Sequence, residues 1–117
     1  MIIGIAGNLS AGKTLSLTFL GAWLKETTGS KVYSNYATSF SDYKIKSYDD
    51  FKKIKNGVLL ADELWFWLDS YKSMDKSAQL IVKILLEAGK SGLDIIYTAQ
   101  DLRQVHPRLR RITDLFA

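Results

Sequence analysis

The chain has 117 residues, enough for one domain with a hydrophobic core, and its composition of 47% hydrophobic and 24% charged residues is that of a globular protein. It has no cysteine, which excludes disulfide scaffolds, thiolate metal sites and cysteine nucleophiles. Its net charge of +4 is compatible with a nucleic acid or a nucleotide as partner but does not select one.

No apolar run in the sequence approaches the roughly 20 residues that a membrane-spanning helix requires. Met1 leads directly into the first apolar segment, which leaves no room for a signal peptide. We therefore expect a single cytoplasmic domain over residues 1–117, lying in the cytoplasm of the host cell if the protein is viral.

The amino-terminal segment combines a short apolar run, a glycine-rich loop and a helical pattern. Residues 2–6 are predicted to form a buried strand, and residues 15–24 a helix that stops at Gly29. Between them lies a complete match to G-x-x-x-x-G-K-[ST], formed by Gly7, Asn8, Leu9, Ser10, Ala11, Gly12, Lys13 and Thr14. A strand before the loop and a helix after it are the context in which this motif binds phosphate.

The loop predicts a site for the phosphates of ATP or GTP. Its glycines let backbone N–H groups approach the β-phosphate, and the helix N-terminus adds about half a unit of positive charge. Lys13 would bridge the β- and γ-phosphates, and the Thr14 hydroxyl would ligate Mg²⁺. The alternative is a glycine-rich turn with a solvated lysine, which the flanking strand and helix disfavour.

The segment that follows is less regular. Residues 31–36 have the composition of a strand, whereas residues 37–46 are too polar to assign to an element. Ser47 and Asp50 resemble a capping box that opens a short helix carrying Phe51 and Ile54. A loose basic stretch runs through this region and would be a solvated face or a contact with DNA; it comprises Lys44, Lys46, Lys52, Lys53 and Lys55.

A second apolar run, residues 58–61, is predicted to be a strand buried on both faces, and Asp62 and Glu63 follow it directly. Asp62 would hold Mg²⁺ opposite the Thr14 hydroxyl. Glu63 would orient and deprotonate the attacking water. An acidic pair after a strand is also typical of a helix cap or a turn, but the phosphate loop favours the catalytic interpretation.

The carboxyl-terminal part begins with the clearest helical pattern, residues 75–90, followed by a predicted strand at residues 93–99. Gln100 would face the γ-phosphate if this strand lies between the two earlier core strands; otherwise it is a solvated polar residue. The tail carries Arg103, Arg108, Arg110 and Arg111. One of them, with Arg108 and Arg111 as first choices, would act as an arginine finger on a neighbouring subunit's nucleotide, or the group would form a basic patch.

Strands therefore alternate with helices along the chain. This order predicts an α/β fold with three layers, α/β/α, in which helices cover both faces of a mostly parallel sheet. In such sheets ligands bind beyond the carboxyl ends of the strands, and each candidate site residue falls at such an end.

Taken together, GNLSAGKT, VLLADE and IIYTAQD with the arginine-bearing tail resemble the additional-strand, catalytic-glutamate class of P-loop ATPases. Within this class the pattern is most similar to the HerA–FtsK branch, especially the small genome-packaging ATPases of archaeal viruses and the zonular-occludens-toxin-like assembly proteins of filamentous phages. The resemblance assigns Lys13 and Thr14 to the Walker A motif, Asp62 and Glu63 to the Walker B motif, and Gln100 to the polar sensor.

The resemblance also implies a RecA-like P-loop core that uses ATP and Mg²⁺, a double-stranded DNA partner and a homo-oligomeric ring. Cores of this family usually include a fifth strand beside the first. Here only residues 112–117 remain to form it, so we expect a minimal core or one truncated at the carboxyl terminus.

The functional hypothesis is an ATPase, with hydrolysis driving the movement of DNA in a translocating or viral genome-packaging motor. The absence of an Asn-Lys-x-Asp guanine-recognition motif favours ATP over GTP. Two alternatives stay open: a small nucleotide kinase, and a nucleotide-gated assembly or binding module.

Overall fold

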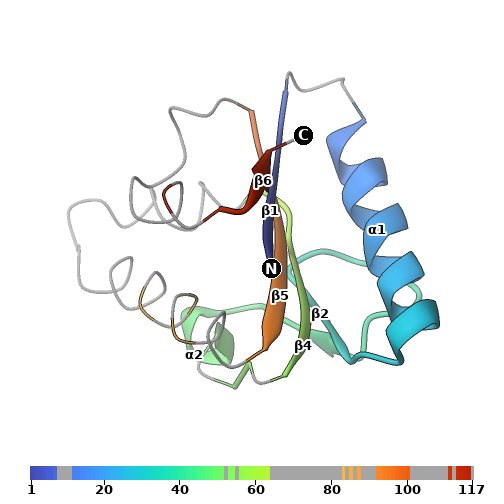
Figure 1. Ribbon diagram of the computed structural model, residues 1–117. Coiled ribbons are helices and arrows are strands. Elements are labelled where there is room, and N and C mark those ends of the chain that lie inside the picture. Colours follow the sequence, from blue (N-terminus) through green and yellow to red (C-terminus); the bar gives the residue numbers. More distant parts are fainter. Residues whose placement is uncertain are drawn as a thin grey trace.

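The computed structural model describes residues 1–7, 12–51, 53–54, 56–63, 92–100 and 113–116, and in addition Lys83, Leu85, Glu87 and Arg111. In chain order its elements are β1 (Ile2–Ala6), α1 (Lys13–Thr28), β2 (Val32–Ser34), β3 (Tyr43–Lys44), α2 (Tyr48–Phe51), β4 (Gly57–Ala61), β5 (Leu93–Ala99) and β6 (Leu115–Phe116). The strands form one sheet in the order β3-β2-β4-β5-β1-β6, and every pairing between them is parallel. Figure 1 shows α1 on one face of this sheet and α2 on the other, which confirms the predicted α/β class.

The centre of the sheet is apolar. Val58, Leu59 and Leu60 of β4 have no exposed surface, and Ile95 of β5, which lies opposite Leu59, has none either. Strands this apolar are stable only where both faces of the sheet are covered. On the α1 face, Val58 and Leu60 pack with Leu17 in a hydrophobic cluster.

Glycines in the left-handed conformation bound α1 at both ends. Gly12 precedes the helix with φ 73°, and Gly29 follows it with φ 68°. The Gly29 N–H donates to the Lys25 carbonyl at 2.9 Å, which closes the last turn. The helix and its stop were therefore predicted correctly.

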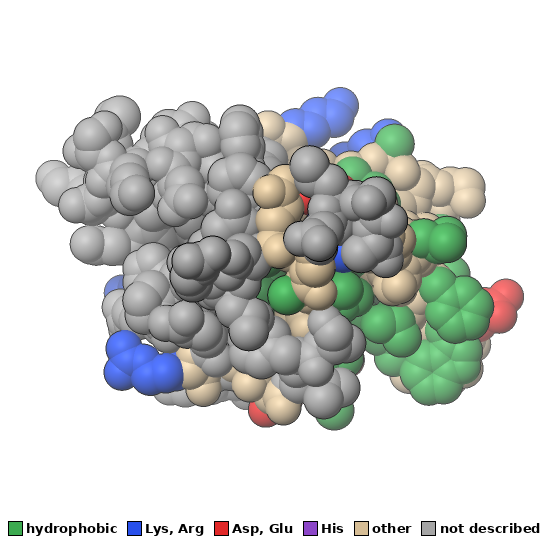
Figure 2. Space-filling model, turned by 90° about the horizontal axis from the view of Figure 1, so that it is seen from above, with side chains coloured by type: hydrophobic (Ala, Val, Ile, Leu, Met, Phe, Trp, Pro, Cys, Tyr) green, Lys and Arg blue, Asp and Glu red, His purple; other side chains and the backbone are tan. Residues whose placement is uncertain are grey.

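One side of α1 faces the sheet and the other is apolar but exposed. Leu17 is fully buried, whereas Leu15, Phe19 and Trp23 are 75%, 70% and 54% exposed. Figure 2 shows hydrophobic side chains gathered at the surface on the side of the molecule where α1 lies. The sequence predicted the helix but not that two of its aromatic rings lie outside.

The edge of the sheet beyond β2 differs from the prediction. Strand β2 ends at Ser34 rather than at residue 36, and the unassigned segment contains β3. The Asp42 carboxylate supports this edge, because it accepts the Val32 N–H at 2.8 Å and the Lys25 ammonium at 3.0 Å. The apolar pattern gave no signal for β3, since both of its side chains are exposed.

The short helix α2 begins as its capping box predicts. The Asp50 carboxylate accepts the Ser47 N–H at 3.1 Å and the Lys46 N–H at 2.8 Å. Phe51, the last residue of α2, and Ile54, which follows the helix, are both buried. Most of the predicted helix at 75–90 lies outside the described residues; within it, Leu85 is buried while Lys83 and Glu87 are exposed, as a helix with one apolar face requires.

At the carboxyl terminus, β6 occupies the place beside β1 that the resemblance assigns to a fifth core strand. It pairs Leu115 with Ile3 and Phe116 with Gly4. Asp114, just before β6, forms hydrogen bonds with the backbone of β1. The Asp114 carboxylate accepts the Ile2 N–H at 2.7 Å, and the Asp114 N–H donates to the Ile2 carbonyl at 2.7 Å. The expected strand beside β1 is thus present, as a two-residue strand in the described part of the tail.

Candidate nucleotide-binding site

The strand order brings the carboxyl ends of β4, β5 and β1 side by side. Because β5 lies between β4 and β1, Gln100 emerges between the Asp62 end and the start of the phosphate loop. The Gly7 N–H donates to the Ala99 carbonyl at 3.2 Å, which ties the first loop residue to the end of β5. The topology on which the Gln100 prediction depends is therefore confirmed.

The glycine-rich loop is described at its two ends. Lys13 lies in the first turn of α1 and is only 5% exposed. Its ammonium group donates to the Gly7 carbonyl at 2.9 Å, so the side chain reaches back across the loop opening. Asn8, Leu9, Ser10 and Ala11 lie outside the described residues.

The structure brings Thr14 and Asp62 together, although they are 48 positions apart in the chain. The Thr14 hydroxyl donates to the two Asp62 carboxylate oxygens, at 3.1 and 3.3 Å. Two oxygens on adjacent corners of a Mg²⁺ octahedron, each about 2.1 Å from the ion, lie about 3 Å apart. The pair is therefore spaced as two neighbouring ligands of one magnesium ion would be.

Thr98, in β5, connects the two acidic residues Asp62 and Glu63. Its side chain is fully buried. The hydroxyl donates to Asp62 Oδ1 at 2.7 Å and accepts the Glu63 N–H at 2.8 Å. The sequence placed Thr98 in the right segment but gave it no role, since its position follows from the register of β4 against β5.

Asn35 holds Asp62 from the opposite side, at the end of β2. Its side-chain oxygen accepts the Asp62 N–H at 2.7 Å, and its amide nitrogen donates to the Asp62 carbonyl at 2.8 Å. The amide thus extends the β2–β4 ladder by one step after the β2 backbone has turned away. Sequence analysis missed this residue; its signal was a polar amide at the end of a predicted strand.

Glu63 is half-buried and has φ 52°, the left-handed region. For a residue other than glycine this conformation costs roughly 1 kcal/mol. The hydrogen bond from its N–H to Thr98 helps to hold it there. The backbone therefore turns sharply straight after the strand, so Glu63 lies at the carboxyl end of β4.

Thr18 of α1 and Tyr36, which follows β2, lie close to the candidate metal ligands. The Tyr36 hydroxyl and the Thr18 hydroxyl are 2.7 Å apart, and Thr18 donates to the Thr14 carbonyl at 2.7 Å. Burial raises the pKa of Tyr36; the Thr18 hydrogen bond lowers it, and the nearby Asp62 carboxylate raises it. Tyr36 thus places a neutral hydroxyl near the candidate metal ligands.

Of the remaining predicted residues, the structure gives the position and exposure of Gln100 and Arg111. Gln100 is half-buried and follows β5 directly. Arg111 is helical and exposed, whereas Arg108 lies outside the described residues. Among the residues that the structure describes, no group of three or more His, Asp or Glu side chains could hold a metal alone. A magnesium ion here would therefore complete its shell with phosphate oxygens and water, as is usual for Mg²⁺.

None of the helices in the described residues is long and apolar enough to cross a membrane.

Comparison with known proteins adds independent evidence. The family described as "Zonular occludens toxin (Zot)" matches residues 34–116, a range that includes Asp62, Glu63 and Gln100 but not the glycine-rich loop. The chain is 39% identical over 62 residues to the gene 1 protein of Enterobacteria phage fd, and 43% identical over 56 residues to that of Escherichia phage If1. To the gene 1 protein of Salmonella phage IKe it is 39% identical over 56 residues.

These alignments are partial on both sides. They cover 53% of this chain for the fd protein and 48% for the If1 and IKe proteins. They span 18% of the fd protein and 15% of each of the other two. The chain thus spans less than a fifth of the length of these relatives.

Proposed function

Because this chain belongs to the zonular occludens toxin family, we propose that it is the Mg²⁺-dependent ATPase domain of a phage protein. The observation that carries the proposal is the Thr14–Asp62 contact at 3.1 Å, which joins the phosphate loop to the acidic strand end. Such a junction is what a nucleotide-bound magnesium ion requires.

In this proposal Lys13 and the N-terminus of α1 bind the phosphates. The Lys13 ammonium would exchange the Gly7 carbonyl for the β- and γ-phosphate oxygens, and the loop N–H groups would bind the β-phosphate. Thr14 and Asp62 would hold Mg²⁺, which neutralises charge that develops on the phosphates. Asn35 holds the Asp62 backbone, and Thr98 holds the Asp62 carboxylate.

Glu63 is proposed as the general base. It follows Asp62 directly and leaves the sheet at the end where the phosphates would lie. Its carboxylate would accept a proton from the water that attacks the γ-phosphorus. Gln100, between the two motifs, would donate to a γ-phosphate oxygen or hold that water.

The wider activity is also a proposal. Relatives with gene 1 names come from phages of enteric bacteria, which supports the filamentous-phage arm of the resemblance and not the archaeal-virus arm. We propose a homo-oligomeric motor that moves DNA during phage assembly. Arg108 or Arg111 would contact the nucleotide of a neighbouring subunit.

The direct test is phosphate release from ATP, with and without double-stranded DNA. We expect release without any acceptor, its loss on removal of Mg²⁺, and its loss in Glu63→Gln with ATP binding retained. Lys13→Ala should lose ATP binding itself. A nucleotide kinase would be nearly silent without an acceptor, and a binding module would keep its function in Glu63→Gln; either result contradicts the proposal.

A further inference from the structure

A hollow of about 840 Å³ lies away from the candidate nucleotide site. Ser30 and Lys31 line it just before β2, and Asn56 lines it just before β4. It therefore opens near the amino ends of these strands, whereas the Thr14–Asp62 contact lies at the carboxyl end of β4. No part of the proposed ATPase chemistry uses it.

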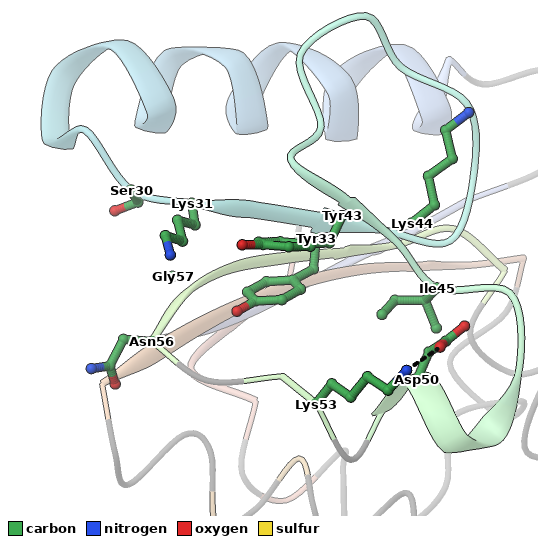
Figure 3. Close-up of a pocket in the computed structure, with 10 residues that line it drawn as sticks. All are labelled: Ser30, Lys31, Tyr33, Tyr43, Lys44, Ile45, Asp50, Lys53, Asn56 and Gly57. Carbon is green, nitrogen blue, oxygen red and sulfur yellow. Dashed lines mark ion pairs between the residues drawn. The ribbon is translucent and has the colours of Figure 1, made fainter.

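Two tyrosine rings from neighbouring strands are stacked at this hollow. The ring centroids of Tyr33 and Tyr43 are 5.1 Å apart, with an angle of 21° between the planes. Tyr33 is 6% exposed and Tyr43 is 48% exposed. Figure 3 shows the two rings one above the other. Tyr33 thus supports Tyr43 from within, and Tyr43 offers solvent an aromatic ring of fixed orientation.

The charged side chains that the structure describes around the rings are mostly basic. Among them, Lys31, Lys44 and Lys53 line the hollow together with one carboxylate, Asp50. The Lys31 ammonium lies 5.9 Å from the centroid of the Tyr43 ring.

Asp50 is already engaged. Backbone N–H groups, first that of Lys46, lower its pKa, so it stays ionised, and Lys53 pairs with it at 3.7 Å (Figure 3). Neither Lys31 nor Lys44 forms an ion pair with a described carboxylate. The hollow therefore keeps an excess of positive charge.

We propose that this hollow binds single-stranded nucleic acid. An unpaired base would stack on the half-exposed ring of Tyr43, an interaction that any base can make. Lys31 and Lys44 would neutralise backbone phosphates, while Ser30 and Asn56 can form hydrogen bonds with a base edge. A duplex hides its base faces within the stack, so it cannot use the tyrosine. The inference goes beyond the ATPase proposal, because it needs neither bound nucleotide nor hydrolysis.

The test is fluorescence anisotropy of a fluorescein-labelled single-stranded DNA of mixed sequence, titrated with the chain in the absence of nucleotide. Tyr43→Ala should weaken binding about tenfold, because base stacking on an aromatic side chain is lost. Tyr43→Phe, the matched control, keeps the ring and should bind like the wild type. Lys31→Gln should reduce the slope of log affinity against log salt by about 0.7, one single-strand phosphate contact.

Three results would overturn the proposal. They are unchanged affinity in Tyr43→Ala, equal competition by a duplex of the same sequence, and binding of an extended peptide but not of DNA. Circular dichroism shows whether Tyr43→Ala is folded, and Tyr43→Leu is the second variant, since it keeps apolar bulk without an aromatic face. Lys13→Ala removes a residue of the proposed phosphate site and should still bind the single strand like the wild type. Failure of the ATPase proposal can therefore be distinguished from failure of the single-strand proposal.

Discussion

At the scale of single residues, the Thr98 hydroxyl is the link between the proposed metal ligand and the proposed base. It donates to Asp62 and accepts from the Glu63 N–H, and it is fully buried. Valine has the same shape but can form neither bond. A buried donor or acceptor that loses its partner costs about 1–3 kcal/mol.

We therefore expect Thr98→Val to lower the free energy of unfolding by about 1–3 kcal/mol and the turnover of ATP by about tenfold or more. Thr98→Ser keeps the hydroxyl and should retain most of both. Urea denaturation and phosphate release measure the two effects. Wild-type turnover by a stable Thr98→Val would show that the link does not position Glu63.

The contacts of Asp42 predict that the stability of the fold depends on pH. Hydrogen bonds, first from the Val32 N–H and then from Lys25, hold the pKa of Asp42 below its ordinary value of 3.8. A carboxylate with a lowered pKa contributes stability that is present above its ordinary pKa and is lost as the pH falls through the lowered value. Asp42→Asn should be less stable than the wild type at neutral pH, with a smaller further loss in acid.

Urea midpoints measured at neutral pH and at about pH 3 check this expectation. Glu26→Gln, at an exposed position of α1, is the control and should follow the wild type. Parallel pH curves for Asp42→Asn and the wild type would contradict it.

At the scale of elements, local pattern predicted those elements whose signals are local. Strand β1 is a short apolar run, β5 is mostly apolar apart from Asp94 and Thr98, and α1 has a glycine at each end. Strand β3 was missed because its residues are exposed and its place depends on bonds made by Asp42. Asn35 and Thr98 were missed for a related reason: they meet Asp62 only through the register between strands, which no local pattern contains.

The approach of α1 to the sheet depends on Gly21. A Cβ atom at this position would overlap the side chain of Leu60, which is fully buried. In a solvent-exposed helix, alanine is favoured over glycine by about 1 kcal/mol. Here overpacking, at about 1–3 kcal/mol, should exceed that gain.

Gly21→Ala should therefore lower the unfolding free energy, and Leu60→Val should recover part of the loss in the double variant. Chemical denaturation of the two single variants and the double variant measures the coupling. Ser16→Ala, at an exposed position of the same helix, is the control and should be neutral or slightly stabilising. A stabilised Gly21→Ala would show that α1 can move away from β4.

At the scale of the whole molecule, the family match and the phosphate loop lie in separate parts of the chain, and both support the ATPase proposal. The family match covers residues 34–116, and the phosphate loop lies before it. The sheet joins them, since β5 pairs with β1 on one side and β4 on the other. A ligand that bridges Thr14 and Asp62 should accordingly stabilise the whole fold.

Saturating ATP and Mg²⁺ should raise the melting temperature, because a ligand at 100 times its Kd adds about 2.7 kcal/mol to the unfolding free energy. Chelation of Mg²⁺ should remove most of this increase, and Lys13→Ala should show none. Differential scanning fluorimetry measures the shift. An equal shift in Lys13→Ala would place the nucleotide elsewhere.

The shortness of β2 has a mechanical consequence. Tyr33, in the middle of this three-residue strand, supports the exposed ring of Tyr43, and Asn35, immediately after the strand, holds the backbone of Asp62. Two residues of extended chain span only about 7 Å. Tension on a polymer held at Tyr43 would therefore reach the Asp62 backbone through a single extended segment.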